Sequence, residues 1–70
     1  MASQITTVLI ENNKGEQTYG VYLMTEHGIC NDQEIYSYDE RAERGAAFAK
    51  AQKKARDWAA EYKAKIETNW

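Results

Sequence analysis

The sequence contains no proline, a single cysteine, a single histidine and no long apolar run. One cysteine, Cys30, cannot form an intramolecular disulfide, which excludes the disulfide frameworks of small secreted domains. The longest aliphatic run, residues 8–10, is much shorter than the roughly 18 residues that a membrane-spanning helix needs. The first four residues lack the basic and apolar stretches of a signal peptide. We therefore expect a cytoplasmic protein that does not associate with membranes.

The chain has 70 residues, which is enough for one domain, residues 1–70. A domain of this size buries only about 60% of the surface that its unfolded chain exposes, so its core is thin. A thin core leaves little room for a deep pocket that excludes water and holds several reacting groups. The size of the chain therefore predicts a protein that is not an enzyme and that carries no cofactor.

Charge is unevenly distributed along the chain. Residues 1–40 hold seven acids and one base, a charge of −6, and residues 41–70 hold eight bases and four acids, a charge of +4, which sum to the net −2. Such polarity can steer a charged partner, and it can also draw the two halves of one small domain together.

Three segments read as strands, at about residues 5–11, 16–25 and 29–36. The first is rich in β-branched residues, and the second alternates so that Tyr19, Val21 and Leu23 share one face while Tyr22 and Met24 share the other. The third has a polar centre, which is typical of an edge strand that resists pairing with other chains. The short connections favour an antiparallel meander.

A long amphipathic helix is predicted at about residues 38–67. Ser37 and Glu40 fit a capping box, with Ser37 as the N-cap. Alanine recurs through the segment, and apolar residues follow one another at steps of three and four. Gly45 is the one weak position, and it indicates a bend or a close contact.

The expected fold class is α+β: a three-stranded antiparallel meander followed by one helix packed on one face of the sheet, in the order βββα. The predicted core consists of Val8, Ile10, Tyr19, Val21, Leu23, Phe48, Ala51, Ala55, Trp58, Tyr62 and Ile66.

Residue types that carry chemistry are present but poorly grouped. His27 lies three residues before Cys30, but a metal site needs three or four ligands, and a nucleophilic Cys–His pair needs an orienting group and an oxyanion hole. Asp32 and Glu34 share one face of the third strand, where a sheet edge offers little desolvation to shift their pKa values. The four glycines are scattered and form no phosphate-binding loop. We predict no catalytic residues and no metal ligands.

Two surfaces are candidates for binding. The first is an acidic, tyrosine-bearing side of the sheet that would bind a protein partner, because tyrosine is enriched at interfaces. Its predicted residues are Glu11, Glu16, Tyr22, Glu26, Asp32, Glu34 and Tyr36. The alternative is direct nucleic-acid binding by basic positions of the helix, namely Lys50, Lys53, Lys54 and Arg56. A half-covered sheet also leaves pairing into a homodimer open.

In overall type the chain resembles the small acidic inhibitors carried by bacteriophages, such as anti-CRISPR and anti-restriction proteins. The resemblance rests on a chain of about seventy residues without proline, an acidic sheet (residues 5–36) and one lysine- and alanine-rich helix (residues 38–67). No specific motif is shared, so no functional residue is carried over. The resemblance implies a non-enzymatic protein that blocks a host complex of protein and nucleic acid by occupying its surface.

Overall fold

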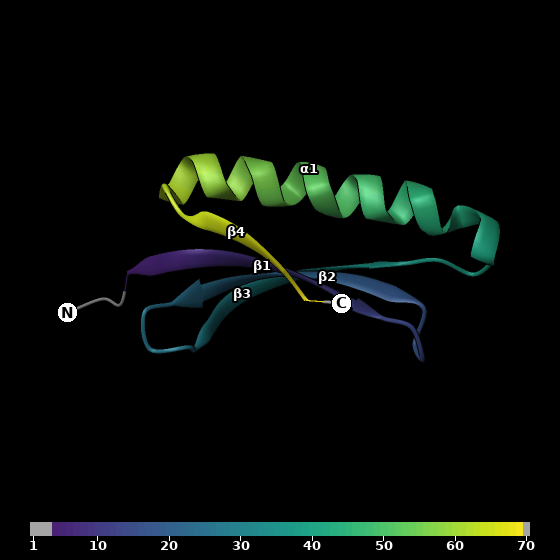
Figure 1. Cartoon of the computed structure of the whole chain (residues 1–70), viewed down its shortest axis with the longest axis horizontal. Helices are drawn as coiled ribbons and strands as arrows, with labels where there is room; N and C mark the ends of the chain where they lie inside the picture. The colour runs from purple at the N-terminus through teal and green to yellow at the C-terminus, as the bar shows by residue number, and fades with distance from the viewer. Residues whose placement is uncertain (1–3, 70) are drawn as a thin grey trace.

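The computed structural model describes residues 4–69, which form a four-stranded sheet covered on one face by a helix (Figure 1). The strands are β1 (Ile5–Asn13), β2 (Thr18–Thr25), β3 (Cys30–Ser37) and β4 (Lys65–Asn69), in the spatial order β3-β2-β1-β4. A short 3₁₀ turn, η1 (Arg41–Glu43), leads into the helix α1 (Arg44–Tyr62). The predicted α+β class and βββα order are therefore roughly right. The sheet differs from the prediction in having a fourth strand, β4, which runs parallel to β1.

The antiparallel pairing of β1, β2 and β3 confirms the predicted meander. Val8 lies opposite Leu23 and Ile10 lies opposite Val21, and all four side chains are buried. The predicted face of β2 is therefore the face that packs against α1. β3 is an edge strand, as its polar centre indicated.

The core lies between this face of the sheet and α1. Ala51 and Ala55 have no exposed surface, so the helix backbone approaches the sheet closely at its centre. Phe48 is partly buried against the core. Tyr38, which the predicted core did not include, is buried, and its ring lies 5.9 Å from that of Tyr19. The buried apolar residues are Ile5, Val8, Ile10, Tyr19, Val21, Leu23, Tyr38, Ala47, Ala51, Ala55 and Trp58.

The helix begins later than the sequence predicts. Ser37 is the last residue of β3, so the predicted capping box is wrong. The N-cap of α1 is Glu43, which makes no side-chain capping hydrogen bond, and η1 fills the space between strand and helix. Pairing of Ser37 with Thr18 in the sheet holds Ser37 in an extended conformation, and this nonlocal contact overrides the local capping signal.

The helix also ends earlier than predicted, because residues 63–67 do not continue it. Lys63 adopts a left-handed conformation with φ of 54°, and the Ala64 N–H donates to the Ala59 carbonyl at 3.0 Å, which closes the last turn. The chain then runs parallel to β1, with Ile66 beside Val8. Pairing with β4 satisfies backbone groups of β1 that would otherwise form an open edge.

Two residues assigned to the core from their helical spacing are exposed instead. Tyr62, the last residue of α1, is 38% exposed, and Ile66, on the edge strand β4, is 42% exposed. Tyr62 ends α1 and Ile66 lies on the edge strand β4, so each is at the border of the core.

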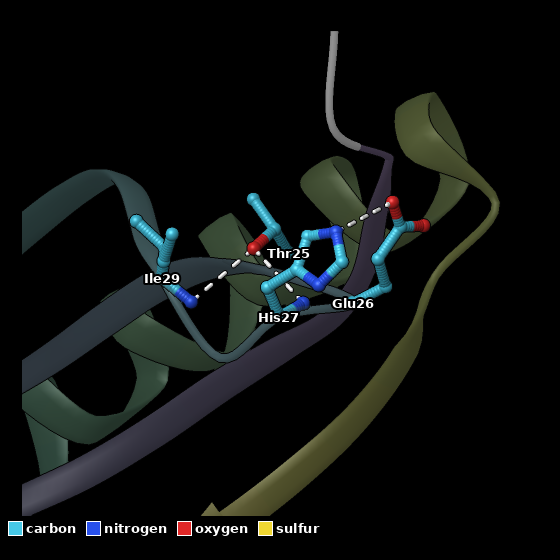
Figure 2. Close-up of polar contacts among 4 residues, drawn as sticks. All are labelled: Thr25, Glu26, His27 and Ile29. Atoms are coloured by element: carbon cyan, nitrogen blue, oxygen red, sulfur yellow. Dashed lines mark hydrogen bonds and ion pairs between the residues drawn. The ribbon is translucent and has the colours of Figure 1, made fainter. Parts of the chain in front are cut away.

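Thr25 organises the β2–β3 turn. Figure 2 shows its hydroxyl accepting hydrogen bonds from the backbone N–H groups of His27, at 3.3 Å, and Ile29, at 3.2 Å. Thr25 also donates its own N–H to the Ile29 carbonyl at 2.9 Å. Gly28 completes the turn with φ of 77°, a conformation that side chains with a Cβ disfavour.

The conformation of Gly28 gives a stability prediction with a matched control in Gly45. A Cβ added at either position meets no atom within 4 Å, so only backbone conformation distinguishes them. Gly28→Ala should lower the free energy of unfolding by about 1–2 kcal/mol, because φ is positive there. Gly45→Ala should raise it by roughly 0.5–1 kcal/mol, because Gly45 lies within α1. Urea titrations followed by far-UV circular dichroism measure both, and equal effects would contradict this account of the turn.

No helix within residues 4–69 is long and apolar enough to cross a membrane.

Candidate functional site

α1 covers one face of the sheet and leaves the other face uncovered (Figure 1). Strand pairing places several apolar side chains on the uncovered face. Leu9 on β1 lies opposite Tyr22 on β2, and Ile35 on β3 lies opposite Gly20. Met24 is two residues along β2 from Tyr22 and therefore shares its face. Leu9, Tyr22 and Met24 are half-buried and Ile35 is 46% exposed. We call the surface formed by Leu9, Tyr22, Met24 and Ile35 the open face.

The ring of Tyr22 lies flat against the middle of the open face. A Cβ added at Gly20 would collide with the ring of Tyr22, with its Cε2 atom 2.7 Å away. Gly20 is itself buried, since the ring fills the space above it. A glycine inside a strand commonly marks such a close approach. The absence of a side chain at Gly20 thus leaves the space that the Tyr22 ring occupies on the open face.

Carboxylates surround Tyr22 on this side of the sheet. Burial raises the pKa of Tyr22 above its ordinary value of 10.0, and the nearby charges of Glu11 and Glu16 raise the pKa further. Glu11 lies opposite Gly20, and it accepts a hydrogen bond from the Asn69 side chain at 3.1 Å. Glu67 also lies on this face, opposite Leu9, and forms an ion pair with Lys65 at 3.0 Å. The open face therefore has an acidic border.

The raised pKa of Tyr22 gives a pH prediction. The folded pKa exceeds the unfolded one, so the unfolded state loses this proton first, and the contribution to stability present below about pH 10 is lost as the pH rises further. Absorbance titration at alkaline pH should show late-ionising phenols, and Tyr22→Phe should remove one of them while that of Tyr36 remains. Glu11→Gln should move this pKa only part of the way to its ordinary value, because burial is the larger cause. Complete restoration by Glu11→Gln would contradict the packed position of the ring.

The structure divides the predicted acidic set between two faces of the sheet. Glu11 and Tyr22 lie on the open face, and the charge of Glu16 acts on Tyr22 from the adjoining turn. The three predicted residues on β3 lie on the other face, that of α1. Asp32, Glu34 and Tyr36 pair with Leu23, Val21 and Tyr19, which face α1. Glu26 lies in the β2–β3 turn, beside His27 (Figure 2).

Leu9 and Ile35 belong to the open face, and the sequence analysis did not assign them to it. The available signal was strand alternation: Leu9 lies between the two buried residues Val8 and Ile10, so it must point to the opposite face. The same alternation from Tyr36, which packs against the core, places Ile35 on the open face.

The predicted basic residues form a second surface, between α1 and the edge strand β3. Lys50, Lys53 and Lys54 line a shallow groove of about 300 Å³ together with Tyr36 and Asp57. The Lys54 ammonium lies 4.7 Å from the centre of the Trp58 ring, which restrains its position. Burial raises the pKa of Tyr36, with smaller contributions from the charges of Glu34 and Asp57. We call the groove lined by Tyr36, Lys50, Lys53, Lys54 and Asp57 the lysine groove.

Arg56, the fourth predicted basic residue, is exposed and does not line the lysine groove.

His27 and Cys30 make separate contacts. The His27 imidazole lies 3.5 Å from the Glu26 carboxylate (Figure 2), whereas the Cys30 thiol donates to the Asp32 carbonyl at 3.2 Å. Within residues 4–69 no three His, Cys, Asp or Glu side chains are grouped so that they could hold a metal ion.

Comparison with known proteins gives no relative. A scan against protein-family models found no match, and neither a search of the curated proteins nor a search of the solved structures matched the chain.

Proposed function

We propose that this protein is a non-enzymatic interaction module that binds a protein partner through its open face. One observation carries the proposal: Leu9, Tyr22, Met24 and Ile35 lie together on a sheet face that α1 leaves uncovered. Apolar and aromatic side chains grouped in this way are typical of the centre of a protein interface, with polar residues at its border.

The acidic border of the open face defines the chemistry of the partner. Glu11, Glu16 and Glu67 lie on this side, and Glu67 forms an ion pair with Lys65. A complementary surface would be apolar at its centre and basic at its edge. Basic surfaces of this kind occur on proteins that handle nucleic acid. We therefore propose a protein of that class as the partner, with the bound module blocking access of nucleic acid to it.

The Tyr22 ring occupies the space that Gly20 leaves on this surface. Tyrosine side chains at the centre of an interface commonly contribute a large share of the binding free energy. Gly20→Ala should displace the ring without altering any charge, because the added Cβ would occupy its place. It should therefore weaken binding although every side chain of the open face is retained.

The test is a binding measurement with a partner captured from extract of the source cells and then purified. Ile35→Lys and Tyr22→Lys should each weaken binding by roughly 100-fold or more, the loss expected for central interface residues. Ala60→Lys adds the same charge on the exposed surface of α1 and should change the affinity less than about threefold. Equal losses for Ala60→Lys and Ile35→Lys would contradict the proposal. Self-association abolished by Ile35→Lys would instead assign the open face to a second copy of the chain.

Nucleic-acid binding by the lysine groove is the second candidate function. The observation that favours it is the grouping of three lysines with the aromatic ring of Tyr36 along one groove. Proteins that bind single strands combine a basic groove with aromatic rings on which bases stack.

The second function is tested with a labelled single-stranded oligonucleotide and fluorescence anisotropy at low and high salt. Charge reversal at Lys50, Lys53 and Lys54 should abolish binding, whereas Arg56→Glu, outside the groove, should weaken it only slightly. Absence of binding at low salt would remove this function, because phosphate contacts strengthen steeply as salt is lowered.

A further inference from the structure

Basic residues from distant parts of the sequence meet at the end of the molecule where α1 begins. The β1–β2 turn and the start of α1 lie at the same end (Figure 1). A backbone hydrogen bond joins the turn to the segment that leads from β3 to η1, since the Tyr38 N–H donates to the Gln17 carbonyl at 3.0 Å. Between them lies a pocket of about 280 Å³ lined by Lys14, Gln17, Tyr38, Arg41 and Arg44. We call this pocket the cation pocket.

The positive side chains that line the cation pocket form no ion pairs with the other described residues. Lys14 is the only base in the first forty residues, and it meets here the first two arginines of the second half. Within residues 4–69, none of the three forms an ion pair; the ion pairs there are His27 with Glu26 and Lys65 with Glu67. No Asp or Glu lines the pocket. Three cations held together without a counter-charge favour an anionic ligand.

The side chain of Arg44 is oriented before any ligand binds. Its Nε atom donates to the Tyr19 hydroxyl at 2.9 Å, and the Tyr19 ring packs against the rings of Tyr38 and Phe48. This contact fixes the plane of the guanidinium. Its two terminal nitrogens make no hydrogen bond to residues 4–69, so both can donate hydrogen bonds to two oxygens of a ligand. Arg44 is also the first residue of α1, where the helix dipole favours negative charge.

We propose that the cation pocket binds the phosphate group of a small phosphorylated molecule. Three cations match a doubly charged phosphate monoester better than a singly charged carboxylate, and a guanidinium fork binds two phosphate oxygens at once. The volume of about 280 Å³ suits a compact ligand. This site lies apart from the open face and the lysine groove, shares no residue with either, and does not depend on the proposed function.

The test is calorimetric titration with glycerol 3-phosphate at low salt, with acetate as the control for a single negative charge. Saturable binding of glycerol 3-phosphate is expected, with acetate at least about tenfold weaker. Arg41→Gln and Lys14→Gln should each lower the affinity by about tenfold, the loss expected for a charged contact. Both side chains are exposed, so neither change should unfold the protein. Arg56→Gln removes the same charge from another part of α1 and should alter the affinity less than about twofold.

Three results would overturn the proposal. The first is an absence of saturation up to about 10 mM glycerol 3-phosphate, a concentration that corresponds to binding of only a few kcal/mol. The second is an equal loss of affinity in Arg56→Gln and Arg41→Gln, which would indicate a general effect of charge. The third is tighter binding of a single-stranded oligonucleotide than of glycerol 3-phosphate with the same dependence on Arg41, which would assign the pocket to nucleic acid. Comparing the 5′-phosphorylated oligonucleotide with its unphosphorylated form would then separate terminal from backbone phosphates.

Discussion

Replacing Trp58 by alanine is expected to lower the free energy of unfolding by about 3–5 kcal/mol, the usual loss on truncating a buried aromatic side chain. Trp58 is 8% exposed and packs between α1 and the sheet. A 70-residue domain has a total stability of roughly 4–10 kcal/mol, so this loss removes much or all of it. Urea unfolding followed by circular dichroism measures the change without relying on tryptophan fluorescence.

Tyr62→Ala is the matched control for the Trp58 substitution. Both aromatic residues lie on the apolar stripe that the sequence predicted to be core, four residues apart. Tyr62 is 38% exposed, however, so its truncation should cost less than about 1.5 kcal/mol. Similar losses for the two variants would mean that Tyr62 is buried as fully as Trp58, contrary to the structure.

Placing aspartate at Val21 is expected to prevent folding. Val21 has no exposed surface and lies at the centre of the sheet beneath α1. A carboxylate there would be buried without a partner, which costs more than a domain of this size can lose. Loss of the cooperative unfolding transition, with random-coil chemical shifts in an NMR spectrum, would confirm the effect.

Ile35→Asp tests the opposite face of the same sheet. Ile35 is 46% exposed on the open face, so the new carboxylate remains in water and folding should survive with a change within about 1 kcal/mol. A folded Val21→Asp together with an unfolded Ile35→Asp would show that the two faces are exchanged. Since a shift of one residue in strand register exchanges them, this pair also tests the register of β1, β2 and β3.

Sequence reasoning succeeded where the signal was local and periodic. Alternation along β2 placed Val21 and Leu23 in the core and Tyr22 on the other face. Apolar residues at helical spacing likewise identified Ala51, Ala55 and Trp58 as the buried side of the helix. In each case, packing strengthened a preference that the local sequence already had.

The two ends of the helix could not be predicted because nonlocal contacts decide them. Residues 63–67 contain lysine, alanine and glutamate, all good helix formers, and neither glycine nor proline stops the helix. The left-handed conformation of Lys63 costs roughly 1–2 kcal/mol, which pairing of β4 with the free edge of β1 offsets. Nothing near Lys63 in the sequence signals that this edge is available.

The candidate surfaces depended in the same way on strand pairing. The acidic set was gathered by residue type, whereas the pairing of β3 with β2 sends Asp32, Glu34 and Tyr36 to the face of α1. The register of the β2–β3 pairing also shifts between Leu23 and Met24, so that Leu23 pairs with Asp32 and Met24 pairs with Cys30. The cation pocket was not predicted at all, since Lys14 and Arg41 are brought together only when the β1–β2 turn meets the helix.

The most direct test of the open face is an NMR map of isotope-labelled protein titrated with the purified partner. The account predicts that the largest chemical-shift changes fall on Leu9, Tyr22, Met24 and Ile35, with the amides of residues 50–57 of α1 nearly unchanged. Changes concentrated on residues 50–57, with the open face unaffected, would contradict it and assign binding to the helix.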